Sequence, residues 1–287
     1  LASSLAEGTI SALNYASRLN WLPYGLVAIS IVTVLYPSIT EFAVKGEEER
    51  IGAAVGRGLQ LLAFIMIPST FGLSLLRVPI VRLAFERGAF SPEDTLLTAN
   101  ALLFYSLGLV WISWRELLNR TFFAFQDTAT AMKIGVVSMV ANIGFNLALI
   151  RPLGYRGLAL GTSLAAFTAV CLLLYRLNSA VRTFHMGSLL LGLLKIFVSS
   201  GLMAGAVWWV RDALFLPQGL LNQTVTRIVG RGALFDAAGL LLCVATGLAV
   251  YGVSAWMLNI ETLYDLLDTA RGVGERCLRI SLTKGLG

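Results

Sequence analysis

Long apolar runs separated by short polar stretches make up most of this chain. About 20 consecutive apolar residues form a helix long enough to cross the hydrocarbon core of a bilayer. The pattern therefore predicts seven membrane-spanning helices joined by mostly short connections. They are residues 8–36, 52–76, 92–114, 132–150, 156–175, 187–210 and 233–258.

Prolines and one serine mark where these helices are expected to bend, end or begin. Pro23 predicts a kink inside the first span, and Pro37 lies near its expected end, before a polar loop. Ser91 followed by Pro92 is typical of a helix start, because serine caps the first turn and proline fits its first position. The charged stretch just before Ser91 is too short to span, which predicts a short interfacial helix and a turn.

Composition indicates a protein with several membrane spans rather than a soluble domain. Hydrophobic residues make up 57% of the 287 residues and charged residues only 13%, and the mean hydropathy is +0.78. Soluble domains carry about 25% charged residues. The net charge of +6 is spread over the connecting loops, so it does not indicate a nucleic-acid partner.

Cysteine, histidine and motif content argues against a metal centre and against catalysis. Cys171, Cys243 and Cys277 lie in three separate segments without metal-ligand spacing, and each is expected to be a buried apolar residue. The single histidine, His185, excludes a histidine-rich site. No HExxH, GxSxG, Walker A or Cys-x-x-Cys motif is present, so the chain is not predicted to be an enzyme. Any transport would then be driven by an ion gradient, the membrane potential or substrate supply.

Basic residues in alternate connections predict the orientation of the spans. One side of the membrane receives twelve lysines and arginines, and the other side receives eight. Cytoplasmic loops carry the excess of basic residues in membrane proteins. The count therefore predicts a cytoplasmic C-terminus and a cytoplasmic loop after the first span, with residue 8 outside. The basic, amphipathic tail at residues 261–287 is expected on the membrane surface or in the cytoplasm.

Arg18 is the one charged residue of the first span. A charge at the centre of a membrane helix costs about 2.5–3.5 kcal/mol on insertion scales, so it should face protein or water. Glu7, Ser11, Asn14 and Arg18 recur at helical spacing and form one polar stripe. The stripe fits a functional arginine in a cavity, or an arginine that extends its head to the membrane interface. Lys195, near the start of the sixth span, is expected to extend to the interface in this way.

Asparagine and threonine side chains form a second candidate group. Asn142 and Asn146 lie one turn apart in the fourth span, and Thr162 lies in the fifth, its expected antiparallel neighbour. Their oxygens could hold a small hard cation such as sodium. The alternative is a structural contact between two helices, worth about 0.6 kcal/mol.

Glycine pairs one turn apart occur in three of the spans. Small residues at this spacing allow two membrane helices to approach closely, so each pair marks a candidate helix contact. The pairs are Gly52 with Gly56, Gly157 with Gly161, and Gly201 with Gly205.

Four phrases of the sequence resemble one family of membrane proteins. They are LNYASRLNWLPYGL, RVPIVRLAFERGAFSPEDT, RTFFAFQDTATAMKIG and NIGFNLALIRPLGYRGLALGTSLAA, in this order over residues 8–175. These phrases are similar to the MurJ/MviN family of lipid II flippases in the MOP exporter superfamily. The resemblance implies an all-α, MATE-like fold of fourteen transmembrane helices, arranged as two six-helix lobes and a final pair. This chain resembles helices eight to fourteen, and the first lobe and the seventh helix are expected upstream.

The resemblance also implies a function in peptidoglycan synthesis. The family moves lipid II, an undecaprenyl-pyrophosphate-linked precursor, from the inner to the outer leaflet of the bacterial inner membrane by alternating access. Arg18 matches an arginine that the family requires in its central cavity. Ser11 and Asn14 lie on the same stripe and are expected to line the cavity with it.

Some members of the family carry a sodium site, and Asn142, Asn146 and Thr162 fall at its positions. Asn146 stands where a sodium-binding member would have an aspartate. Trp21 stands where members often have Gln or Glu, and Ala131 replaces a common proline. Sodium is therefore a hypothesis for this chain, and no other cofactor is expected.

The resemblance divides the chain into three parts. Residues 1–180 are a partial transport lobe, residues 181–260 are the final helix pair beside a groove for the lipid tail, and residues 261–287 are the cytoplasmic tail. The expected partners are lipid II, membrane lipids and the N-terminal lobe. Two rival interpretations remain: an exporter of drugs or other lipid-linked oligosaccharides, and a non-transporting scaffold for cell-wall enzymes. A scaffold would have no need for Arg18 inside a span.

Overall fold

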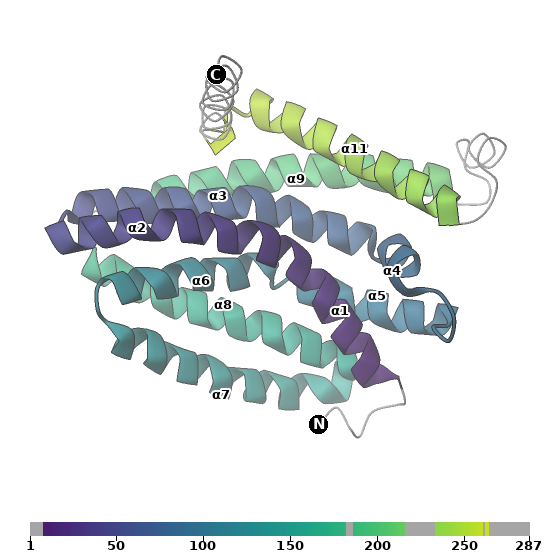
Figure 1. Cartoon of the computed structure of the whole chain (residues 1–287), viewed down its shortest axis with the longest axis horizontal. Helices are drawn as coiled ribbons and strands as arrows, with labels where there is room; N and C mark the ends of the chain where they lie inside the picture. Colours follow the sequence, from purple (N-terminus) through teal and green to yellow (C-terminus); the bar gives the residue numbers. More distant parts are fainter. Residues whose placement is uncertain (1–7, 182–185, 216–232, 261, 264–287) are drawn as a thin grey trace, which may run out of the picture.

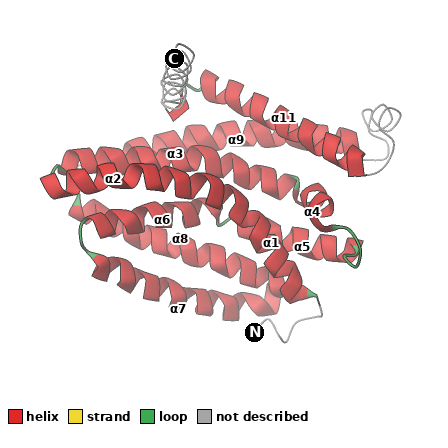
Figure 2. Cartoon of the chain, viewed as in Figure 1, coloured by secondary structure: helices red, strands yellow, loops and turns green. Residues whose placement is uncertain are grey.

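The computed structural model describes residues 8–181, 186–215, 233–260 and 262–263. Every regular element in these ranges is a helix, and most helices run along the long axis of the molecule (Figure 1 and Figure 2). Within the described residues, six helical segments are long and apolar enough to span a membrane, and one bent pair makes a seventh. The all-α fold is confirmed, and the seven predicted spans correspond to these six helical segments and the bent pair.

The first span contains an irregular turn. It consists of α1 (Thr9–Pro23), the π-helical turn η2 (Tyr24–Ala28) and α2 (Ile29–Lys45). Pro23 has no N–H to donate to the helix ladder. The bend predicted at Pro23 takes the form of this wider turn, which follows the proline directly.

Pro37 lies inside α2 and does not end it. The prediction that the span ends near Pro37 and is followed by a polar loop is therefore wrong, because the polar residues directly after Pro37 are helical. The helix continues to Lys45, whose ammonium pairs with the Glu41 carboxylate one turn earlier at 2.5 Å. It ends at Gly46, whose φ of 67° lies in the left-handed region that glycine adopts at helix ends. The connection to the next helix is therefore only a short turn.

The short helix predicted before Ser91 and the helix start predicted at Ser91 are both confirmed. α3 (Glu48–Leu75) is followed by the short α4 (Arg77–Phe85) and then by α5 (Pro92–Ser106). The Ser91 hydroxyl accepts a hydrogen bond from the Asp94 N–H at 3.2 Å, and the Asp94 carboxylate accepts one from the Ser91 N–H at 2.9 Å. This capping box satisfies two backbone donors at the start of α5.

The third span is a bent pair, and the single helix predicted over residues 92–114 is wrong. α5 ends at Ser106, and α6 (Leu109–Ala124) continues the span at an angle of 44°. At the break, the Ser163 hydroxyl donates to the Phe104 carbonyl at 2.8 Å. A helix break inside a membrane needs such a donor, because the interrupted ladder leaves carbonyl groups free.

The remaining spans agree with the predicted ones to within a few residues at each end. They are α7 (Thr128–Leu153), α8 (Tyr155–Ala180), α9 (Met186–Phe215) and α11 (Ala233–Met257). Apart from two positions, the predicted tail at 261–287 lies outside the described residues.

Successive spans run in opposite directions, so their ends collect at the two ends of the bundle (Figure 1). The starts of α1, α5, α8 and α11 lie toward the same end as the end of α3. α9 packs between α3 and α11, which places the last helix on the opposite side of the bundle from α7 (Figure 1).

The three cysteines differ in their surroundings. Cys243 is buried, as predicted, whereas Cys171 is exposed on α8, so the prediction is wrong for Cys171. An apolar residue on the outer face of a membrane helix can contact lipid and needs no protein cover. Cys277 and His185 lie outside the described residues.

Candidate functional site

The predicted polar stripe forms one face of α1. Leu13 and Ala16 are buried on the opposite face, in a cluster with residues of α5 and α8. Ser11, Asn14 and Arg18 are all exposed. The apolar face therefore holds α1 in the bundle and leaves the polar face uncovered by any described element.

Arg18 makes a cation–π contact and no hydrogen bond or ion pair within the described residues. Its guanidinium carbon lies 5.9 Å from the ring centroid of Tyr15. This contact is not a hydrogen bond, so the five N–H donors of the guanidinium have no acceptor within the described residues. Such a group can bind two oxygens of a phosphate side by side. Glu7, the fourth member of the predicted stripe, lies outside the described residues.

A pocket of about 500 Å³ lies beside the start of this face, between α1 and the α4–α5 region. Ser11 and Tyr15 line it from α1, and Arg87 and Asp94 add one positive and one negative side chain. Arg18 lies further along α1 and does not line it. In the sequence, Arg87 is one of the basic residues in the connections, and no neighbouring residue indicates that the segment after α4 lies next to α1.

Asn142, Asn146 and Thr162 do not converge on one point. The Asn146 amide N–H donates to the Asn142 amide oxygen at 3.0 Å. The Thr162 side chain is exposed, and its hydroxyl donates to the Leu158 carbonyl of its own helix at 3.1 Å. The two asparagines therefore form a contact along α7 that does not include the threonine.

Asn146 is held against the next helix by a glycine. Its amide oxygen is buried without a hydrogen-bond partner among the described residues. A β-carbon at Gly161 would overlap this oxygen, so α7 and α8 can pack this closely only because residue 161 is a glycine.

An apolar pocket of about 480 Å³ lies between α3, α9 and α11. At one end, the Tyr251 hydroxyl on α11 donates to the Phe64 carbonyl on α3 at 2.6 Å. Residue patterns alone do not identify this pocket, because its walls come from segments far apart in the chain. Its lining residues are Pro23, Phe64, Ile65, Pro68, Ser69, Gly72, Leu73, Leu76, Ile80, Met203, Val207, Cys243, Val244, Gly247, Leu248 and Tyr251.

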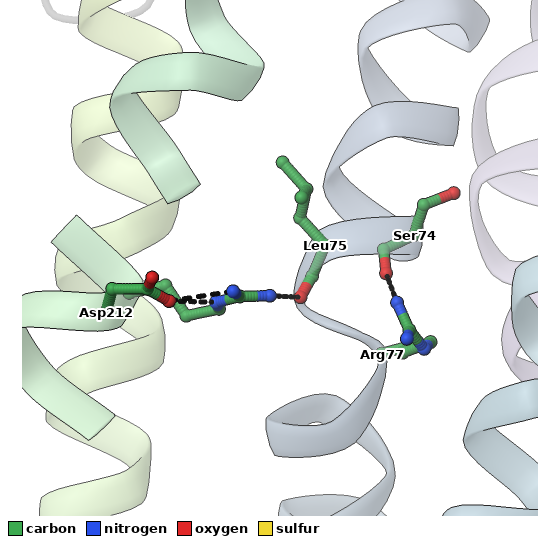
Figure 3. Close-up of polar contacts among 5 residues, drawn as sticks. Ser74, Leu75, Arg77 and Asp212 are labelled. Atoms are coloured by element: carbon green, nitrogen blue, oxygen red, sulfur yellow. Dashed lines mark hydrogen bonds and ion pairs between the residues drawn. The ribbon is translucent and has the colours of Figure 1, made fainter. Parts of the chain in front are cut away.

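Two arginines each bond one of the last carbonyls of α3, from different sides (Figure 3). Arg211 on α9 donates to the Leu75 carbonyl at 3.3 Å and to the Asp212 carboxylate at 2.7 Å. Arg77 donates to the Ser74 carbonyl at 2.7 Å. Burial, and after it the positive charge of Arg211, lower the pKa of Arg77 from its ordinary value, although an arginine remains charged.

Six apolar helices and one bent pair in the described part of the chain define a multi-pass helical membrane protein. On one exposed helix face, the Arg18 guanidinium has no hydrogen bond or ion pair within the same residues. A family model described as "Lipid II flippase MurJ" matches residues 1–230. The chain belongs to this family, in agreement with the resemblance of its sequence phrases.

Individual relatives agree with the family match. The chain is 32% identical over 247 residues to the probable lipid II flippase MurJ of Vibrio cholerae, which covers 84% of this chain and 47% of that protein. It is 30% identical over 249 residues to the probable lipid II flippase MurJ of Rickettsia prowazekii, covering 83% and 48%. The chain thus spans about half the length of the curated relatives it matches.

A solved structure supports the same assignment. The chain resembles a lipid II flippase MurJ in an inward closed conformation, with 27% sequence identity and a TM-score of 0.69. The match covers 91% of this chain and 49% of that one. The helical arrangement described above is therefore that of about half of a MurJ protein.

Proposed function

We propose that this chain is part of a lipid II flippase of the bacterial inner membrane, which moves lipid II from the inner to the outer leaflet by alternating access. Family membership and relatives described as probable lipid II flippases support this function. The observation that carries it is Arg18, an exposed charge in an apolar span with no polar partner within the described residues. A scaffold protein gives no reason to maintain so costly a charge in the membrane.

The chemistry of the substrate explains why an arginine is needed. A pyrophosphate that crosses the membrane must exchange its water for fixed hydrogen-bond donors. Arg18 suits this exchange, because its planar fork forms two parallel bonds to phosphate oxygens and stays charged when buried. Ser11 and Asn14 lie on the same exposed face and add neutral hydrogen-bonding groups. We assign these three residues to the substrate cavity.

The exposed face of α1 is one wall of this cavity. In the proposed whole protein, the N-terminal lobe that the family resemblance implies forms the opposite wall. Alternating access then consists of one lobe rocking against the other around the site. The loop-charge count supports a cytoplasmic C-terminus for the assembled protein.

Substitution of Arg18 in the full-length protein tests this proposal. Arg18→Ala should abolish lipid II export, and Arg18→Lys should retain part of it, because lysine keeps the charge but loses the fork. Both variants should insert normally, since removing a charge from a span makes insertion easier. The measurement is rescue of growth after depletion of the native flippase, with membrane abundance checked by blotting.

Arg176→Ala is the matched control, because this exposed arginine lies near the end of α8. It should rescue growth fully. Full rescue by Arg18→Ala at normal abundance would remove Arg18 from the mechanism, because an arginine that merely extends to the interface predicts near-normal export.

A further inference from the structure

A pocket with both polar and aromatic walls lies beside the exposed face of α1 that carries Arg18. Its volume of about 500 Å³ is within the range of roughly 300–1,000 Å³ that small-molecule sites occupy. Its walls come from α1, from the end of α4 with the turn that follows, and from α5. The assignment of Arg18 to a phosphate does not account for the side chains that gather here.

One wall of this pocket consists of three aromatic rings in mutual contact. The centroid of the Tyr15 ring lies 4.7 Å from that of Phe85 and 5.5 Å from that of Phe90. The Phe85 and Phe90 centroids are 6.0 Å apart. All three residues line the pocket and are only half-buried, so part of this aromatic wall is available to a ligand. The negative faces of such rings attract the C–H groups of a ligand.

The charged side chains of the pocket balance each other. Arg87 Nη2 donates to the Ala84 carbonyl at 3.3 Å, and Asp94 Oδ2 accepts from the Ser91 N–H at 2.9 Å. Arg87 and Asp94 are the charged residues of the lining, and together they give it no net charge. A lining with donors, acceptors and no net charge favours a neutral ligand rich in hydroxyl groups over an anion.

A buried hydroxyl on α5 favours the same class of ligand. Thr98 lines the pocket, is 0% exposed, and has no hydrogen-bond partner for its Oγ1 among the described residues. A buried polar group without a partner carries a desolvation penalty. A ligand hydroxyl would remove this penalty, either directly or through a bridging water molecule.

Tyr15 connects the pocket to Arg18. The ring that belongs to the aromatic wall lies 5.9 Å from the Arg18 guanidinium carbon. Ser11, which also lines the pocket, lies seven residues before Arg18, or about 10 Å along the helix at about 1.5 Å per residue. A group attached directly to a phosphate at Arg18 is therefore within reach of the pocket.

We propose that this pocket is a subsite for a neutral amino-sugar ring of the transported lipid, whose pyrophosphate binds Arg18. The C–H face of the sugar stacks on the aromatic wall, and its hydroxyl groups bond Asp94 and Arg87. This inference rests on the proposed function, because peptidoglycan precursors carry their amino sugars directly on the pyrophosphate. The pocket then recognises the head group, whereas Arg18 binds the phosphate that many lipids share. The predicted orientation places this end of α1 outside, on the side where the head group is released.

Binding of three lipids to the purified full-length protein tests the proposal, with native mass spectrometry as the measurement. The lipids are lipid II, undecaprenyl pyrophosphate with one N-acetylglucosamine, and undecaprenyl pyrophosphate alone. Phe90→Ala removes one ring of the wall, and Ala89→Leu fills the pocket from an exposed lining position. Each should weaken binding of the two sugar-bearing lipids about tenfold and leave binding of the third unchanged. Arg18→Ala should weaken binding of all three lipids.

Phe123→Ala and Ala129→Leu are the matched controls for these two substitutions. Phe123 on α6 and Ala129 on α7 are exposed and lie outside the pocket. Both variants should bind all three lipids as the wild type does.

Unchanged binding of the sugar-bearing lipids in Phe90→Ala or in Ala89→Leu would overturn the proposal. An equal loss for all three lipids would also overturn it, because such a loss does not depend on the sugar. A loss for lipid II alone would assign the pocket to the peptide part of the head group instead. The proposed function fails separately, if Arg18→Ala binds undecaprenyl pyrophosphate normally and rescues growth.

Discussion

Arg18 and Lys195 are both basic residues inside predicted spans, yet their surroundings differ. The Lys195 ammonium donates to the Asn259 carbonyl at 3.4 Å, just beyond the end of α11. This contact agrees with a lysine that extends toward the membrane interface. Arg18 makes no such contact within the described residues and lies over Tyr15 instead. A basic residue inside a span therefore has a hydrogen-bond partner in the case of Lys195, and none within the described residues in the case of Arg18.

The contact between Asn142 and Asn146 leads to a prediction about sodium. Because the Thr162 hydroxyl bonds its own helix and no carboxylate is present in this group, we expect a structural contact rather than a cation site. Replacing potassium with sodium should leave the melting temperature of the full-length protein unchanged. Asn146→Leu should lower it, since the contact is worth about 0.6 kcal/mol on average.

Thr162→Val is the control for this experiment and should have no effect on the response to either ion. A rise in melting temperature with sodium that disappears in Asn146→Leu would contradict the structural interpretation and establish a cation site.

At the scale of the elements, two spans are interrupted, and for different reasons. The interruption after Pro23 has a local cause that is visible in the sequence. The break between α5 and α6 has a tertiary cause, because Ser163 of α8 donates to the Phe104 carbonyl there. Gly108 lies so close to Ser163 that a β-carbon would be 2.5 Å from the serine oxygen. Neither contact can be inferred from the residues around the break.

Ser163→Ala tests whether this contact stabilises the break. The substitution leaves the Phe104 carbonyl without its donor, so the free energy of unfolding should fall by about 0.6–1.7 kcal/mol. The measurement is the thermal or denaturant stability of the purified protein. Ser179→Ala on the same helix is the control, because that hydroxyl is exposed and bonds only its own helix at Tyr175. Equal effects of the two substitutions would show that the α8 contact is not specific.

At the scale of the whole molecule, the antiparallel order of the spans sorts the connections into two sets. Figure 1 shows the ends of the described helices in two groups, at opposite ends of the bundle. This arrangement agrees with the assignment of alternate connections to the two sides of the membrane, on which the count of basic residues is based. The assignment of one end to the cytoplasm follows from the excess of basic residues there.

Cysteine labelling tests this orientation in a full-length protein whose native cysteines are replaced by serine. Glu93 and Glu49 are exposed and lie in the first turns of α5 and α3, two helices that start at opposite ends of the bundle (Figure 1). Glu93→Cys should react with a membrane-impermeant maleimide from the periplasm, and Glu49→Cys should react only after permeabilisation. The reverse pattern would show that the predicted orientation is inverted.

The sequence by itself determined the features that depend on local chemistry or on the membrane. A span needs about 20 apolar residues with internally paired backbone groups, so apolar runs alone identify the seven spans. The capping box at Ser91 and the short helix α4 were predictable for a similar reason, since each depends on neighbouring residues. The polar face of α1 was predictable from the 3.6-residue period, because lipid and polar groups do not mix.

Only the tertiary structure decided which faces of the apolar helices meet. Gly161 packs against Asn146, whereas the equally spaced Gly201 and Gly205 have open space around them. The Thr162 hydroxyl bonds its own helix rather than the asparagines, and the pocket between α3, α9 and α11 joins segments distant in the chain. The physical reason is that lipid tails are as apolar as leucine, so an apolar face of a span can meet lipid or protein equally well. The spacing of apolar residues in the sequence therefore does not fix how such a helix is rotated about its own axis. The contacts between side chains of neighbouring helices fix this rotation.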